Sequence, residues 1–178
     1  MHSGYWTKCD GGVPAAGPDV SDLVVLMAQD HRSITDTCAM LEVASGRNIG
    51  PLFRRLVDQL LRHEAAEAAV FYPELLAVAG GEIVAERLVS EYRLWEDLID
   101  LEATTSNPDT RPSHLSWRRF SSSVQRHLET EEGIAFPLIV TGVHRSHLHD
   151  LGAKYVEMRR APLRMGIAYV SEGTKVAL

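Results

Sequence analysis

The sequence contains little cysteine and no long hydrophobic run, and each absence excludes a class of protein. Two cysteines in 178 residues, Cys9 and Cys38, cannot form the disulfide framework of a small secreted domain. No apolar stretch approaches the roughly 20 residues that span a bilayer. The first residues lack the basic segment and apolar core of a secretory signal. We therefore expect a cytoplasmic protein with no membrane partner.

The chain also lacks an excess of positive charge, because 18 basic residues face 24 acidic ones and the net charge is −6. Such a field repels the phosphates of nucleic acids, and the arginine pairs are isolated, so no nucleic-acid partner is expected. A glycine-rich phosphate loop, a nucleophile elbow and a Rossmann fingerprint are missing too. With 45% hydrophobic and 24% charged residues, the composition is that of a globular domain.

Apolar residues recur at spacings of three and four almost throughout, which predicts an all-α protein. Long helices are expected over residues 20–44, 49–78, 82–103 and 113–140, and a shorter one over 146–160. Pro73 and Pro137 should disturb the second and fourth helices. Four such helices with short loops predict an antiparallel up-down four-helix bundle with a short extra C-terminal helix. Residues 19–162 form the predicted domain, between an irregular arm (1–18) and a tail (163–178).

The sequence contains two similar copies of a pair of helices. Three features recur with an offset of 64 residues: Arg62-His63 as Arg126-His127, Glu67 as Glu131, and Tyr72-Pro73 as Phe136-Pro137. The first and third helices match with an offset of 61, which pairs His31 with Tyr92. This repetition predicts a pseudo-twofold axis between the two hairpins.

Polar residues lie in the apolar stripes of these helices. At about 100° per residue, His63 and Glu67 fall mid-stripe on the second helix, and His127 and Glu131 do so on the fourth. His31 shares the apolar face of the first helix. On the third helix we expect the buried face to hold Tyr92 together with Ala85, Leu88 and Ile99. No lysine or arginine was found on these stripes to neutralise the carboxylates.

Burying two unpaired carboxylates would cost several kcal/mol each, which a bound cation would offset. Imidazole and carboxylate at positions i and i+4 lie one turn apart on one helix face, so both can reach one metal ion. Two such pairs on facing helices can hold two metals bridged by the carboxylates. Nitrogen and oxygen ligands without thiolate favour iron or manganese over structural zinc.

Other candidates are given structural interpretations. The cluster of His144, His147 and His149 could bind a metal adventitiously, but a solvated polar stretch is favoured. Cys38 is expected to be a small core residue. Three glutamates that flank the motifs are expected to face solvent: Glu64, Glu129 and Glu132.

The motif set resembles the hemerythrin HHE cation-binding domain over about residues 20–140. The residues that carry the resemblance are His31, the run from His63 to Glu67 followed by Phe71-Tyr72-Pro73, and the run from His127 to Glu131 followed by Phe136-Pro137. The resemblance implies a non-haem centre of two Fe ions with an oxo or hydroxo bridge. It makes His31, His63 and His127 terminal ligands, and Glu67 and Glu131 bridging ligands.

Tyr92 stands where this family usually has another histidine. A phenolate ligand favours ferric iron, so we expect Tyr92 to bind iron, with Glu96 as the next candidate and an unligated Tyr92 as the alternative. A ferric centre with few nitrogen ligands fits a catalase- or peroxidase-like protein that consumes peroxide or nitric oxide. The alternative is a di-iron binding protein that senses or stores oxygen, nitric oxide or iron.

Overall fold

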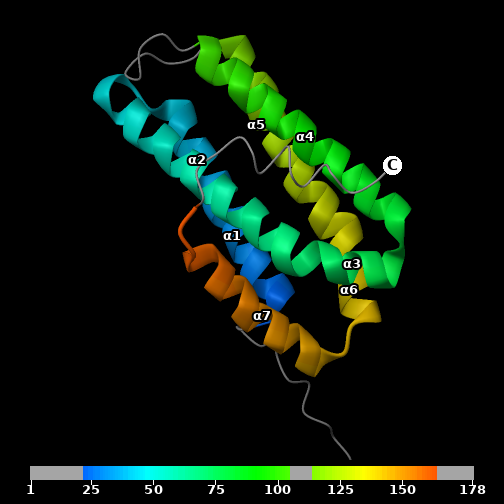
Figure 1. Ribbon diagram of the computed structural model, residues 1–178. Coiled ribbons are helices and arrows are strands. Elements are labelled where there is room, and N and C mark those ends of the chain that lie inside the picture. Colours follow the sequence, from blue (N-terminus) through cyan, green and yellow to red (C-terminus); the bar gives the residue numbers. More distant parts are fainter. Residues whose placement is uncertain (1–21, 105–113, 164–178) are drawn as a thin grey trace, which may run out of the picture.

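The computed structural model describes residues 22–104 and 114–163, and every regular element within them is helical, which confirms the all-α class. The α-helices are α1 (Leu23–Val43), α2 (Ile49–Ala66), α3 (Tyr72–Ala79), α4 (Gly81–Thr104), α5 (His114–Thr130), α6 (Phe136–Gly142) and α7 (Arg145–Arg160) (Figure 1). A short 3-10 turn, η1 (Gly46–Asn48), precedes α2. The predicted arm (1–18) lies outside the described residues, as does the predicted tail after residue 163.

Local chemistry sets the helix ends. The Asp22 carboxylate accepts the Val24 backbone N–H at 3.0 Å and caps α1. Gly80 ends α3 with φ at 82°, a conformation that glycine adopts without strain. This turn sends the chain directly into α4.

Two π-helical segments join the long helices across their prolines. Glu67–Phe71 (η2) links α2 to α3, and Glu131–Ala135 (η3) links α5 to α6. In each segment the residue before the proline donates its N–H to the carbonyl of the motif glutamate, five residues earlier. The expected disturbance at Pro73 and Pro137 is therefore a widened turn that begins at the glutamate. Widened turns of this kind are frequent at functional sites.

The widened turn also moves the buried face forward by one residue. Ala135, Phe136 and Ile139 are buried, whereas Ile134, which an uninterrupted α-helix would bury, is 47% exposed. After Glu67 the corresponding residues Phe71, Tyr72 and Leu75 are buried too, but Val70, the counterpart of Ile134, stays buried as well. The repeat thus preserves the backbone irregularity together with the motif.

The core has two apolar clusters with a polar layer between them. One cluster gathers residues from α1, α3, α6, α7 and the π-helical segments, among them Leu23, Phe71 and Leu151. The other joins α1, α2, α4 and α5, and includes Leu60, Leu94 and Phe120. Because α7 packs on both α1 and α2, it covers one side of the bundle (Figure 1).

The orientation of α4 differs from the predicted one. Its buried side chains include Arg87, Leu94, Leu98 and Leu101, at 0–5% exposure. The face expected to be buried instead lies at the surface: Leu88 is 42% exposed, Tyr92 52% and Ile99 53%. One residue of shift turns a helix by about 100°, and packing against α5 selects the leucine-rich face.

Because α4 buries this other face, the correspondence between α1 and α4 differs from the predicted one. The buried positions of α1 and α4 match with an offset of 60, which pairs Met27 with Arg87, Ile34 with Leu94 and Leu41 with Leu101. His31 then corresponds to Glu91.

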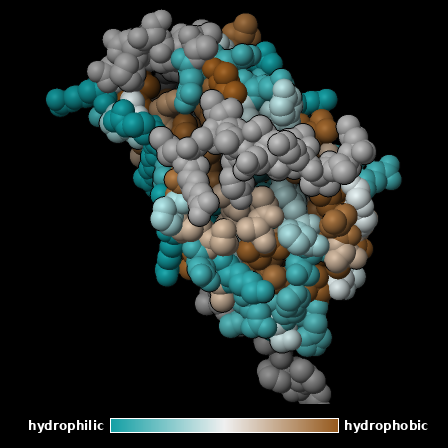
Figure 2. Space-filling model, in the orientation of Figure 1, coloured by the Kyte–Doolittle hydropathy of each residue, from teal (hydrophilic) through white to brown (hydrophobic). Residues whose placement is uncertain are grey.

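The exposed apolar side chains form small groups among hydrophilic ones on the face shown in Figure 2. None of the described helices is apolar enough over a sufficient length to cross a bilayer.

Candidate metal centre

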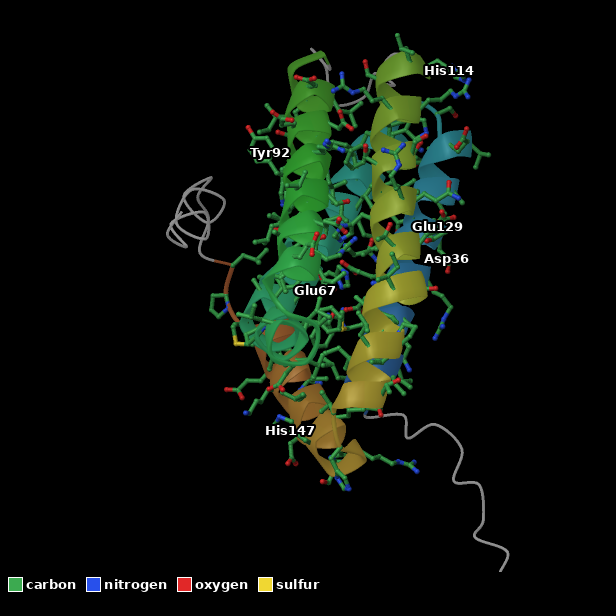
Figure 3. All side chains as sticks on the ribbon, turned by 90° about the vertical axis from the view of Figure 1, so that its right-hand side faces the viewer. Asp36, Glu67, Tyr92, His114, Glu129 and His147 are labelled. Carbon is green, nitrogen blue, oxygen red and sulfur yellow. The ribbon has the colours of Figure 1, made fainter. Side chains whose placement is uncertain are left out.

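Five predicted ligands meet in the polar layer between the two apolar clusters. His31 comes from α1, His63 from α2, Glu67 from η2, His127 from α5 and Glu131 from η3, and each is at most 2% exposed. Figure 3 shows Glu67 in the interior between the helices. Their inner atoms are close: Nε2 of His31 lies 3.2 Å from Oε2 of Glu131, and Nε2 of His63 lies 3.4 Å from Oε1 of Glu67.

These side chains form two overlapping groups, in each of which the potential ligand atoms lie within 4.8 Å of one another. The first group contains His31, His63, Glu67 and Glu131. The second contains His63, Glu64, Glu67 and His127. Because His63 and Glu67 belong to both groups, the two groups adjoin within the polar layer.

The inner atoms of this layer lack hydrogen bonds. Among the described residues, no hydrogen bond is formed by Nε2 of the three histidines, by either carboxylate oxygen of Glu64 and Glu67, or by Oε2 of Glu131, although several of these atoms contact one another. A buried polar atom without a partner costs about 1–3 kcal/mol, and more when it is charged. A cation at the centre of the layer would satisfy these atoms together, so the donor set fits a metal site.

In two of the histidines, the ring nitrogen Nδ1 has a hydrogen-bond partner. Nδ1 of His31 lies 2.8 Å from Oε1 of Glu132, and Nδ1 of His63 lies 2.8 Å from the hydroxyl of Tyr155 on α7. The Tyr155 hydroxyl donates to Oδ2 of Asp30 at 2.7 Å, so it accepts the His63 Nδ1–H. These contacts favour a proton on Nδ1 of both rings and direct Nε2 toward the cluster.

The surroundings of His127 are different. Arg87 is 2% exposed; its Nη2 donates to Nδ1 of His127 at 2.8 Å and forms an ion pair with Glu131. Glu64 is 4% exposed, and its Oε1 lies 2.8 Å from Nε2 of His127. The expectations that no arginine lies among the buried faces and that Glu64 faces solvent are therefore both wrong. Glu129 is exposed as expected, and Glu132 is half-exposed while binding His31.

A family comparison bears on this geometry: the model of the hemerythrin HHE cation-binding domain matches residues 22–139. The chain belongs to this family. The match confirms the family that the motifs indicated and supports cation binding by the polar layer. No curated protein and no solved structure matches the chain significantly. The helix α7, which supplies Tyr155, lies beyond the segment that matches the hemerythrin domain.

Within this hemerythrin domain, Tyr92 does not reach the polar layer. Its side chain is 52% exposed and points away from the bundle on the outer side of α4 (Figure 3). A hydrogen bond to Glu96 raises the pKa of the Tyr92 phenol. Glu96 is also exposed. The prediction that Tyr92 faces the core is wrong, because the helix presents its other apolar face inward.

Glu91 occupies the position that Tyr92 was expected to fill. It lies 3.5 Å from the hydroxyl of Tyr72 and 3.5 Å from the indole nitrogen of Trp95. Burial, together with the nearby charge of Glu64, raises the pKa of Glu91 to about 8. The sequence contained a signal for this face, since Arg87, Glu91, Leu94, Leu98 and Leu101 alternate at spacings of four and three.

The two motif glutamates of the hemerythrin domain differ electrostatically. Burial raises the pKa of Glu67 well above its ordinary value, and the charge of Glu131 adds to this effect. Burial opposes ionisation of Glu131 too, but the surrounding histidines and Arg87 lower its pKa well below the ordinary value. Without a metal ion, one carboxylate of the pair is therefore stabilised as an anion and the other is destabilised.

The remaining candidates lie outside the polar layer. His144 caps α7 by accepting the Ser146 backbone N–H, His147 lies 3.1 Å from Glu74, and His149 is exposed. The solvated interpretation of this histidine cluster is confirmed. Cys38 is a free, partly buried thiol, and burial raises its pKa to about 12, so it is not an activated nucleophile. Cys9 lies outside the described residues.

Proposed function

We propose that this hemerythrin-family protein binds two iron ions in the polar layer, within an antiparallel up-down four-helix bundle. His31 and His63 would hold one ion, and His127 with Glu64 would hold the other. Glu67 and Glu131 would bridge them, since each lies between histidines of different helices. The observation that carries this proposal is the convergence of inward-facing nitrogen and oxygen atoms that form no hydrogen bonds among the described residues.

The donor set supports a reactive centre more than an oxygen carrier. Three imidazoles meet three buried carboxylates, from Glu64, Glu67 and Glu131. Anionic oxygen ligands stabilise the ferric state relative to the ferrous state, whereas reversible oxygen binding requires a stable reduced centre. The buried carboxylates therefore favour ferric iron, whereas Tyr92 lies at the surface.

We infer that the protein consumes peroxide or nitric oxide in the cytoplasm. For peroxide, a bound di-iron centre would supply the redox chemistry by which one molecule is oxidised to O2 while a second is reduced to two molecules of water. The chain's own contribution is to shield the ligands from solvent. The ligands are at most 4% exposed and lie between two apolar clusters, so they admit only small molecules. Glu132 and Tyr155 hold the rings of His31 and His63 in orientation.

The proposal is tested by metal analysis followed by an activity assay. Purified protein should carry about two irons per chain and should evolve O2 when hydrogen peroxide is added. His63→Ala and Glu131→Ala should lose metal and stability together, because metal binding is linked to folding. His147→Ala is the matched control, since that histidine is exposed.

Two results would count against the proposed function. One zinc ion and no iron, in protein from cells replete with both metals, would contradict the di-iron centre. A stable, reversible oxygen adduct on the reduced protein, without peroxide consumption, would favour the binding protein that senses or stores oxygen, nitric oxide or iron.

A further inference from the structure

The two halves of the polar layer are related by the repeat but are not equivalent. His63 corresponds to His127 and Glu67 to Glu131 with an offset of 64 residues. Two charged residues break this symmetry. Arg87 on α4 corresponds to Met27 on α1, and Glu64 on α2 corresponds to Leu128 on α5. All four side chains are buried, so one half contains a buried positive and a buried negative charge where the other has two apolar side chains.

The aromatic neighbours support this pairing of positions. Phe136 stacks on His31, with ring centroids 5.3 Å apart. Tyr72, the counterpart of Phe136, lies beside Glu91, the counterpart of His31. The comparison of Arg87 with Met27 therefore rests on the same register of α4 against α1.

Arg87 places a positive charge beside two of the proposed metal ligands. Its guanidinium is permanently charged, and it contacts both Glu131 and His127. Since arginine can only donate, Nδ1 of His127 must accept, and the neutral ring then carries its proton on Nε2. In the other half, His31 and His63 have the opposite arrangement, with Nε2 free to bind a metal ion.

We propose that Arg87 makes the two metal positions unequal, so that the half around His31 and His63 fills first and the half around His127 fills only when Arg87 withdraws. This inference rests on the proposed di-metal centre. Binding of the second ion requires Arg87 to leave Glu131 and His127. This requirement weakens the second step relative to the first.

The structure contains a place into which Arg87 can move. A groove of about 200 Å³ runs between α4 and α5, and Arg87 itself lines it together with Glu86, Ser90 and Thr130. Nε and Nη1 of Arg87 have no hydrogen-bond partner among the described residues. A rotation of the side chain toward Glu86 would provide a new carboxylate partner and would free Glu131 for the metal.

Arg87 then has opposite effects in the two states of the protein. Without metal, its charge neutralises Glu131 and stabilises the buried layer. With both positions filled, it competes with the second ion. Replacing Arg87 by methionine, the residue at the equivalent position of α1, should destabilise the metal-free protein and strengthen binding of the second metal ion.

The experiment is an anaerobic titration of the full-length metal-free protein with Fe²⁺, followed by calorimetry and by metal analysis. The wild type should show two steps, with the second about 10-fold or more weaker. Arg87→Met should strengthen the second step by about 10- to 100-fold, the range found when groups behind metal ligands are changed. Arg87→Gln, which keeps a polar side chain, should act in the same direction if the methionine variant folds poorly. Arg93→Met is the control, because Arg93 lines the groove and is exposed.

The outcomes separate this inference from the proposed function. Wild-type protein that binds no metal would overturn the di-metal centre itself. Two wild-type sites of equal affinity, or a second step that the Arg87 variants leave unchanged or weaken, would overturn only the role of Arg87. Thermal unfolding of the metal-free proteins gives an independent readout, since a variant as stable as the wild type would show that Arg87 does not neutralise Glu131.

Discussion

Removing the Tyr155 hydroxyl should weaken the metal centre from outside the segment that matches the hemerythrin domain. In Tyr155→Phe, the Nδ1–H of His63 loses its acceptor and Oδ2 of Asp30 loses its donor, both in a buried region. Each unpaired buried group costs about 1–3 kcal/mol. Asp30 keeps its 2.7 Å ion pair with Arg159, and its Oδ2 is only 3.8 Å from Nδ1 of His63. We therefore expect the low end of the range, about 2 kcal/mol in total.

The same substitution should change metal affinity. Without Tyr155, the ring of His63 is free to rotate or to adopt the other tautomer, so Nε2 is no longer presented to the metal. Loss of a group that orients a ligand typically lowers metal affinity by about 10- to 100-fold. The ion bound by His63 should be affected more than the ion bound by His127, which Tyr155 does not contact.

Tyr72→Phe is the matched control for this prediction. Tyr72 is another buried tyrosine, but its hydroxyl makes only a 3.5 Å contact to Glu91, and the equivalent residue of the other repeat is already phenylalanine. It should cost less than about 1 kcal/mol. Urea unfolding of the metal-free proteins and competitive metal titration measure the two effects. If Tyr155→Phe matches the wild type in both assays, α7 has no role in positioning His63.

Two further predictions follow from α4. Tyr92→Phe should leave metal content, the visible spectrum and peroxide reactivity unchanged, because the phenol is 52% exposed on the outer side of the helix; loss of a visible band in this variant would show that the phenolate binds iron after all. Burial raises the pKa of Glu91 from 4.5 to about 8, so the folded protein binds a proton that the unfolded chain has already released. The metal-free protein should therefore lose stability as the pH rises from 4.5 to 8. Glu91→Gln should flatten this pH dependence of the free energy of unfolding, measured in urea. An unaltered pH profile would contradict the raised pKa of Glu91.

Much of the architecture and most of the proposed ligands could be predicted from the sequence, because both are local properties. The positions of the helices depend on apolar spacing, capping residues and turn residues, and their ends agree with the structure within a few residues. The two His-x3-Glu motifs stand in the middle of apolar stripes, so their burial follows from helical periodicity alone. The offset of 64 residues made each motif evidence for the other.

The π-helical segments could be placed only in part. The prolines indicated that an ordinary α-helix would be disturbed, but not how the chain would accommodate them. The widened turns begin at Glu67 and Glu131, because the residue before each proline donates its N–H to the carbonyl five positions earlier. The resulting advance of the buried face is what exposes Ile134.

Tertiary packing decided which face of α4 is buried. The helix carries apolar residues on two faces, one with Leu88 and Ile99 and the other with Leu94 and Leu98, so periodicity does not choose between them. The choice depends on how well each face packs against α5, which is a contact between residues distant in sequence. That contact puts Tyr92 in solvent and buries Arg87 beside Glu131. A buried arginine is stable only where a carboxylate from another helix meets it, and this pairing exists only once the helices are assembled.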